Sequence, residues 1–215
     1  MFVINRRPAS LLGMALLIAA LAGGCSSGGR APESKKAVEG FDKTREAITK
    51  AQGQVNSTNA ALEELSAGGD LQKSFKRYTS SVADLEQSAR DARQRATSMR
   101  ERVKEYTDEW QKEIDTMQDP TIRAGLTERR EAVRNNFENV RNSAQAARDA
   151  YEPYMAQLKE IQRALAIDLT PHNVSAMRPA IDKALQQGQS LKQKLAAMQM
   201  ELDKIMRGTS PSGRG

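Results

Sequence analysis

Cysteine and histidine, the residue types that most often carry nucleophilic or metal chemistry, occur once each in this chain, as Cys25 and His172. One histidine is too few for a histidine-rich metal site. His172 directly follows Pro171 in a predicted turn, and no motif of a Ser-His-Asp triad accompanies it. No glycine-rich phosphate loop follows a predicted strand, and the many carboxylates fall on exposed faces of predicted helices. We therefore expect no enzymatic activity, no cofactor and no metal site, and a different chemistry at Cys25.

The residues before Cys25 predict that this cysteine carries covalently attached lipid. Residues 1–24 combine a basic start, an apolar run over 11–22 and two glycines directly before the cysteine, which is the layout of a secretory signal peptide and is too short for an ordinary membrane-spanning helix. The run LAGGC at 21–25 resembles the lipobox of bacterial lipoproteins, although Ala22 stands where that pattern more often has a large aliphatic residue. The alternative is a free cysteine that follows an ordinary signal peptide by chance. It is the weaker interpretation, because the single cysteine stands at the lipobox position.

The lipobox resemblance implies a location in the cell envelope. In bacterial lipoproteins the thiol at this position is diacylated and the cysteine becomes the mature N-terminus, so we expect acyl chains such as palmitate on Cys25. Several chains, each burying methylene groups at about 0.8 kcal/mol apiece, make such an anchor essentially permanent. Ser26 lacks the inner-membrane retention signal of lipoproteins, so in a Gram-negative host the resemblance implies the periplasmic face of the outer membrane. Residues 25–34 would form the lipidated cysteine and a flexible tether.

The composition favours helices and argues against a nucleic acid partner. Aromatic residues make up 4% of the chain and charged residues 28%, a balance that suits the seams of helical bundles better than a globular core. The formal net charge of +6 becomes +4 once Arg6 and Arg7 leave with the signal peptide, and most charges alternate in sign along the predicted helices. A nucleic-acid-binding protein would concentrate its basic residues on one face. We expect neither a nucleic acid partner nor a small-molecule substrate.

An unbroken apolar pattern runs over residues 71–110. Its members recur at alternating steps of four and three residues: Leu71, Phe75, Tyr78, Val82, Leu85, Ala89, Ala92, Ala96, Met99, Val103, Tyr106 and Trp110. A period of 3.5 residues keeps one stripe facing neighbouring helices and predicts a single long helix packed lengthwise against them. Helical spacing over about 34–65, 120–165 and 171–205 predicts three more helices.

Turn residues separate these four helices. Gly68 and Gly69 end the first, after which Asp70 can cap the second, and the pairs Asp119–Pro120 and Thr170–Pro171 each supply a cap followed by proline at the first helical position. Because short connections make sequential helices antiparallel neighbours, the sequence predicts an all-α fold over residues 35–207, an elongated antiparallel four-helix bundle or coiled coil. Residues 208–215 are predicted to form a disordered tail.

Three positions predict irregularities within the bundle. Pro153 and Pro179 are expected inside the third and fourth helices, where each would remove an amide donor and kink its helix. The simplest function of such kinks is to wrap the helices around their core; a hinge is the alternative. In the first helix, polar residues such as Asn59 occupy seam positions and predict that this helix packs most weakly.

The unequal helix lengths predict a protruding central helical hairpin, which we call the tip and define as residues 103–131. It should project at the end that carries the lipid. Tyr106 and Trp110 line its seam, and Arg130 is level with them within cation–π reach, so these three are candidate partner-binding residues. Three alternatives stand for the tip: a coiled coil that satisfies itself, a site that docks a partner or a second copy, and insertion into a bilayer. The net charge of minus four over 106–128 argues against the last.

Two features lie behind the tip. Folding the second predicted helix onto the third places Ala89, Ala92 and Ala96 opposite Ala144 and Ala147, so that the backbones either approach closely or leave room between them. A basic collar, defined as the cationic residues over 90–104, precedes the tip: Arg90, Arg93, Arg95, Arg100, Arg102 and Lys104. Solvated helix faces are the default interpretation of such a cluster.

The stretches YTDEWQKEI at 106–114, RREAVRNNF at 129–137 and YEPYMAQL at 151–158 are similar to a family of uncharacterised proteobacterial lipoproteins, known only as a domain of unknown function. The resemblance covers most of residues 35–206. It implies helical structure and a Gram-negative envelope, and it transfers no activity.

These observations predict a membrane-anchored envelope lipoprotein with a structural or adaptor role. Its partners would be the membrane, through lipid on Cys25, and another envelope protein or a second copy. One alternative is a periplasmic chaperone-like holdase, which needs a cavity that Ala89, Ala92 and Ala96 could line. The other is non-covalent peptidoglycan binding through the basic collar.

Overall fold

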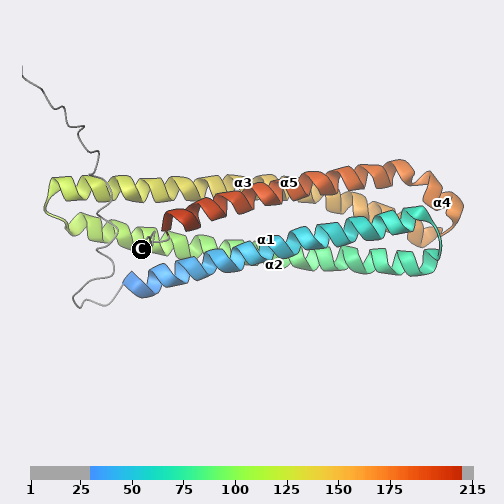
Figure 1. Ribbon diagram of the computed structural model, residues 1–215, viewed down its shortest axis with the longest axis horizontal. Coiled ribbons are helices and arrows are strands. Elements are labelled where there is room, and N and C mark those ends of the chain that lie inside the picture. Colours follow the sequence, from blue (N-terminus) through green and yellow to red (C-terminus); the bar gives the residue numbers. More distant parts are fainter. Residues whose placement is uncertain (1–29, 210–215) are drawn as a thin grey trace, which may run out of the picture.

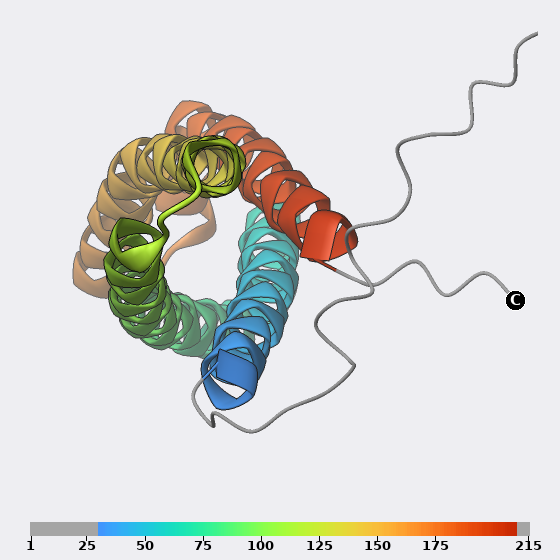
Figure 2. The same cartoon turned by 90° about the vertical axis from the view of Figure 1, so that its left-hand side faces the viewer.

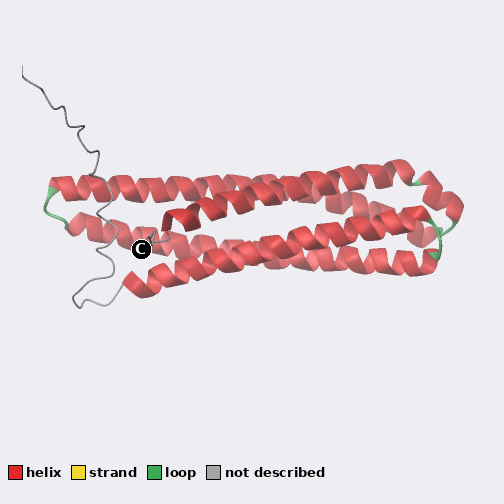
Figure 3. Cartoon of the chain, in the orientation of Figure 1, coloured by secondary structure: helices red, strands yellow, loops and turns green. Residues whose placement is uncertain are grey.

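The computed structural model describes residues 30–209, and every regular element in that range is a helix (Figure 3). The helices are α1 Arg30–Ala67, α2 Leu71–Thr116, α3 Pro120–Ile167, α4 Pro171–Ala176 and α5 Arg178–Thr209. The prediction of an all-α fold is confirmed. Helix α1 begins inside the range 25–34 that we assigned to a tether, and the signal peptide 1–24, Cys25 and residues 210–215 of the tail lie outside the described residues.

The long helices begin at the predicted caps. The Asp70 carboxylate accepts a hydrogen bond from the amide of Lys73 at 3.0 Å. The Asp119 carboxylate accepts two, from the amides of Thr121 and Ile122 at 2.8 and 3.1 Å. Each bond satisfies an amide of the first turn that has no partner within its own helix, which is why these sequences start helices here.

The turn between α1 and α2 depends on two glycines. Gly68 and Gly69 have φ values of +87° and +93°, in the left-handed region that other residues rarely adopt. The chain therefore reverses directly after Ala67.

The fourth predicted helix is divided in two. Helix α4 ends at Ala176 and α5 begins at Arg178, with Met177 between them. Pro179 is therefore the second residue of α5, and its predicted place in a helix interior is wrong. A first turn suits proline, because an amide hydrogen at that position would have no intrahelical acceptor. Pro153 does lie inside α3, as predicted.

The four long helices form an elongated antiparallel bundle (Figure 1). Viewed along its axis, the bundle has the order α1, α2, α3, α5 around a ring (Figure 2). Helix α1 packs chiefly along α2, and α3 chiefly along α5. The α2–α3 hairpin continues past the beginning of α1 and the end of α5, so the predicted protruding tip is present at the end of the bundle where α1 begins (Figure 1).

The core consists of two clusters of buried side chains. The larger cluster lies toward the Gly68 turn and α4, and its large members include Tyr78, Tyr154 and Leu158. The smaller cluster lies toward the tip and includes Phe41, Met99 and Leu202. The bulky core side chains therefore gather at the Gly68 end of the bundle.

Two tyrosines complete the larger cluster with hydrogen bonds. The Tyr78 hydroxyl donates to the carbonyl oxygen of Leu158 at 2.7 Å, and the Tyr154 hydroxyl donates to Oδ1 of Asn59 at 2.6 Å. Burial raises the pKa of both phenols above the ordinary value. The prediction that α1 packs weakly is wrong, because Asn59 is buried and bonded instead of being a polar interruption.

Candidate functional site

The tip holds the aromatic residues that the sequence singled out. Tyr106 and Trp110 lie one turn apart on α2, with ring centroids 5.7 Å apart at an interplanar angle of 52°. Trp110 is only 7% exposed, and Ile114 in the next turn is also buried. The tip therefore covers its own seam, and Trp110 stabilises the hairpin from inside.

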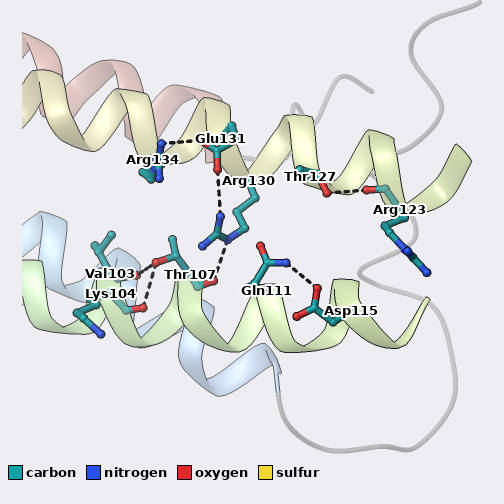
Figure 4. Close-up of polar contacts among 10 residues, drawn as sticks. All are labelled: Val103, Lys104, Thr107, Gln111, Asp115, Arg123, Thr127, Arg130, Glu131 and Arg134. Atoms are coloured by element: carbon teal, nitrogen blue, oxygen red, sulfur yellow. Dashed lines mark hydrogen bonds and ion pairs between the residues drawn. The ribbon is translucent and has the colours of Figure 1, made fainter. Parts of the chain in front are cut away.

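Arg130 links the two helices of the tip (Figure 4). Its Nε donates to the carbonyl oxygen of Thr107 at 3.1 Å, and its Nη1 donates to Oε1 of Glu131 at 3.1 Å. The side chain is 16% exposed. The structure places Arg130 opposite the turn after Tyr106, as predicted, but its guanidinium faces a backbone carbonyl and a carboxylate. A cation–π contact is found elsewhere, between Arg93 and the ring of Tyr151.

The outermost turn of the tip exposes an apolar side chain. Ile122 is 54% exposed. Its neighbour Arg123 donates from Nε and Nη2 to the carbonyl oxygen of Met117, at 3.2 and 2.6 Å, which closes the turn between α2 and α3. This surface can bind a partner by apolar contact within an acidic surround, since residues 106–128 carry a net charge of minus four.

The basic collar is partly neutralised. Lys104 Nζ donates to Oδ2 of Asp108 at 2.6 Å, and this hydrogen bond holds the pKa of the Asp108 carboxyl below its ordinary value. Arg90 lies 3.6 Å from the Glu86 carboxylate. Arg93 differs, because its guanidinium carbon lies 5.1 Å from the centroid of the Tyr151 ring. The collar is therefore not a uniform cationic band.

The opposed alanines leave a cavity halfway along the bundle, between the two core clusters. Its volume is about 120 Å³. We call it the alanine cavity after the residues of α2 and α3 that line it: Ala89, Ala92, Ala96, Ala144 and Ala147. For comparison, an engineered cavity of about 150 Å³ binds benzene. Of the two outcomes expected for these alanines, room between the helices is the one found.

The alanine cavity opens between α2 and α3. Buried side chains of α1 and α5, such as Ile48, Leu191 and Met198, form its floor. Its exposed lining residues are Arg93 on α2 and Arg148 on α3, so these two mark its mouth. Arg148 Nε also donates to Oε1 of Glu152 at 2.9 Å, in a pair exposed to solvent.

Tyr151 completes the mouth of the cavity. Its ring lines the cavity beneath Arg93. Burial raises the pKa of this phenol, and the positive charge of Arg93 opposes that shift. Tyr151 thus keeps its proton at neutral pH and has a hydroxyl that can donate a hydrogen bond.

His172 and the acidic side chains are also residues of types that can carry chemistry. His172 is exposed in the short helix α4. Among residues 30–209, no group of three or more histidine, cysteine, aspartate or glutamate side chains is arranged to hold a metal ion. The described helices also include none that is long and apolar enough to cross a membrane. Arg93 and Arg148 were not predicted as a pair, although both could be placed beside the alanines by counting helical turns.

Comparison with known protein families gives a match over residues 33–208, to the family described as "Protein of unknown function (DUF2959)". The chain belongs to this family. The match covers nearly all of α1 to α5, and it confirms the resemblance to a domain of unknown function. No curated protein and no solved structure matches the chain.

Proposed function

We propose that this member of the DUF2959 family is an envelope lipoprotein, anchored through acyl chains on Cys25, that acts as a structural or adaptor rod. Its partner would be another envelope protein or a second copy of the chain, docked at the tip. The observation that carries this proposal is the projection of the tip beyond α1 and α5, with Ile122 exposed at its outermost turn (Figure 1).

The tip is suited to a rigid docking role. Trp110 and Ile114 fill the seam, and Arg130 bonds α3 to the backbone of α2. A docking surface that is already ordered loses less conformational entropy on binding than a flexible one. In this proposal Tyr106, Trp110 and Arg130 hold the surface from beneath, and Ile122 makes the contact.

The position of the tip favours a partner at the membrane surface. Five residue steps separate Cys25 from Arg30 at the start of α1. A chain of that length spans at most about 18 Å, so lipid on Cys25 would hold the start of α1 close to a membrane. The tip lies at the same end (Figure 1). Its net negative charge disfavours direct contact with anionic lipid and favours a protein partner with basic groups around an apolar pocket.

The docking proposal can be tested with a photo-crosslinking amino acid at position 122 in living cells. The matched control is position 167, because Ile167 is also an exposed isoleucine, at 88%, and lies at the opposite end of the bundle. We expect a discrete adduct from position 122 and none of the same mass from position 167. An adduct of twice the chain mass would identify a second copy as the partner. No adduct at 122, or equal adducts at both positions, would contradict docking at the tip.

The anchor requires a separate test. In a Cys25→Ser variant no thiol is left for acylation, so we expect incorporation of radiolabelled palmitate to be lost. The protein should also leave the detergent phase when membranes are partitioned with Triton X-114. A Ser26→Ala variant is the control, because it alters the neighbouring residue and keeps the thiol. Palmitate labelling that survives in Cys25→Ser would rule out the anchor.

A further inference from the structure

We propose that the alanine cavity binds the apolar chain of a free fatty acid, whose carboxylate lies at the mouth between Arg93 and Arg148. This binding site is separate from the tip and does not depend on the proposed docking role. The fatty acid would be bound and released unchanged. It would therefore be a ligand and not a substrate, and the expectation that the chain has no small-molecule substrate still holds.

The lining of the cavity determines what can enter it. Alanine methyl groups form its walls between α2 and α3, and its floor is apolar, with Ile48, Leu191 and Met198 among its residues. A water molecule in this space would find few of the two to four polar partners that it needs. A hydrocarbon chain has no hydrogen bonds to lose in this space, and its transfer out of water is favourable. The interior therefore favours an apolar chain.

The volume selects one chain over two. The 120 Å³ of the cavity is close to the volume in which benzene is bound, which is room for a few methylene groups. A lipid with two acyl chains would not enter. Ala89 and Ala96 lie one turn to either side of Ala92 and are only half-buried, so the rest of a longer single chain has an apolar path along the α2–α3 seam.

The charges at the mouth select an anionic head group. In the described part of the chain, Arg93 has no carboxylate within ion-pair distance, and its guanidinium is held over the Tyr151 ring. Arg148 stands on the facing helix, and Glu152 pairs with it while both remain exposed. A carboxylate between the two guanidiniums would gain charge-assisted hydrogen bonds, and the Tyr151 hydroxyl offers a further donor.

The other acidic groups near the mouth are engaged elsewhere. Asp149 accepts a hydrogen bond from Gln145 at 2.7 Å, and Glu86 accepts one from Lys159 at 2.9 Å. Glu152 is therefore the carboxylate that competes with the ligand, and it does so only for Arg148.

The test uses the full chain in membranes isolated from cells that produce it, so that the probe is not metabolised. The probe is decanoic acid with a photo-reactive diazirine near the end of its chain, and its uncharged match is the corresponding alcohol. After irradiation, mass spectrometry locates the adducts on the chain. We expect them on the peptides that contain Ala92 and Ala144, with stronger labelling by the acid than by the alcohol.

Two variants separate the chain pocket from the head-group site. Ala92→Leu places a side chain in the cavity and should lower labelling by both probes by at least about tenfold, because several methylene groups lose their burial. Arg93→Gln combined with Arg148→Gln should lower labelling by the acid about tenfold and leave the alcohol unchanged. Arg163→Gln, an exposed and ion-paired arginine of α3, is the control and should change neither.

Several outcomes would overturn the proposal. Adducts scattered over exposed faces of the bundle, or confined to Cys25, would show that the cavity is not the site. Equal labelling by the acid and the alcohol would show that the two arginines do not bind the carboxylate. Circular dichroism of each purified variant shows whether it is folded, and undiminished labelling of a folded Ala92→Leu variant would also overturn the proposal.

Discussion

Helix α2 has small residues on two faces, with different results. On the face toward α1 they are serines, and the two backbones are close. On the face toward α3 they are alanines, and a cavity remains between the helices. Ser74, Ser81 and Ser88 recur every seven residues and are buried. The Thr58 hydroxyl and the Gln54 amide, both on α1, donate to the carbonyl oxygen of Ser81 at 3.1 and 3.3 Å. Side chains of one helix therefore reach the main chain of the other.

The alanine side of α2 has no such attraction across the seam. Large residues at both ends of the α2–α3 seam, Tyr78 and Tyr154 on one side and Met99 and Val140 on the other, hold the helices apart. Between them the alanine methyl groups are too short to meet. The comparison teaches that small residues on both helices do not by themselves bring the backbones together. The close seam of α2 is the one in which side chains of the facing helix bond to its main chain.

The strongest test of the comparison enlarges a residue on the serine side. Ser81→Leu should lower the free energy of unfolding by about 3 kcal/mol, because the added methylene groups have no space where α1 and α2 are close. Urea denaturation followed by circular dichroism measures this. The exposed Ala83→Leu on the same helix should change stability by no more than about 0.5 kcal/mol. A loss below about 1 kcal/mol at position 81 would mean that the two helices can separate cheaply.

A second close approach lies between α5 and α1. A Cβ atom on Gly188 would lie 2.6 Å from Oδ1 of Asn59, the atom that accepts the hydrogen bond from Tyr154. Gly188→Ala should therefore lower the free energy of unfolding by about 2 kcal/mol, because the added methyl group crowds Asn59 and strains its hydrogen bond with Tyr154.

A second glycine provides the control for this prediction. Gly53, also within a helix, has no atom within 4 Å of its added Cβ, so Gly53→Ala should stabilise by about 0.5 to 1 kcal/mol through helix propensity. Equal effects of the two substitutions in thermal unfolding would contradict the close approach at Gly188.

On the alanine side of α2, replacing a small residue by leucine should stabilise the bundle, whereas Ser81→Leu should destabilise it. Ala92→Leu places apolar volume in the alanine cavity and should raise the free energy of unfolding by about 1 kcal/mol. The measurement is the denaturant midpoint, compared with that of Ala83→Leu. A loss as large as that of Ser81→Leu would show that the two seams of α2 do not differ.

The smallest effect concerns a serine hydroxyl. Ser88 is buried, and its Oγ has no hydrogen-bond partner among the described residues. Ser88→Ala should stabilise by about 0.5 kcal/mol, because the unpaired hydroxyl no longer loses its hydration. Ser80→Ala, at an exposed position of α2, reports the helix-propensity share of that gain. A gain at position 88 smaller than that of Ser80→Ala, or a loss of stability, would indicate that a bound water pairs with this hydroxyl.

The long helices and their order could be predicted from the sequence because local signals specify them. The steps of four and three residues identified α2 and α3, and Asp70 and Asp119 identified where these two begin. The position of α4 depends on a contact outside that pattern. Asn173 of α4 donates from Nδ2 to the carbonyl oxygen of Asp168 at 2.7 Å, which ties the short helix to the end of α3.

The candidate sites were predictable only in part, for a similar reason. Counting turns placed Arg130 level with Tyr106, but periodicity does not specify whether a guanidinium meets a ring or a carbonyl oxygen. The serine stripe had a sequence signal, a spacing of seven, that a search for apolar residues passes over. Counting helical turns also places Arg93 and Arg148 beside the alanines, but only the packed structure shows that the two helices leave a cavity there.

The placement of the helix ends also determines how the bundle responds to mechanical load. Arg30 and Thr209 lie at the same end of the rod, on helices that are neighbours in the ring (Figures 1 and 2). A force that pulls these ends apart peels α5 from α1 turn by turn, so that only a few contacts resist at any moment. A force between Arg30 and the far end of α1 at the Gly68 turn instead runs along α1 itself, parallel to its helical hydrogen bonds, and can lengthen α1 only by breaking them and sliding the helix along its neighbours. The same bundle is thus compliant when pulled through its termini and stiff when pulled along its axis.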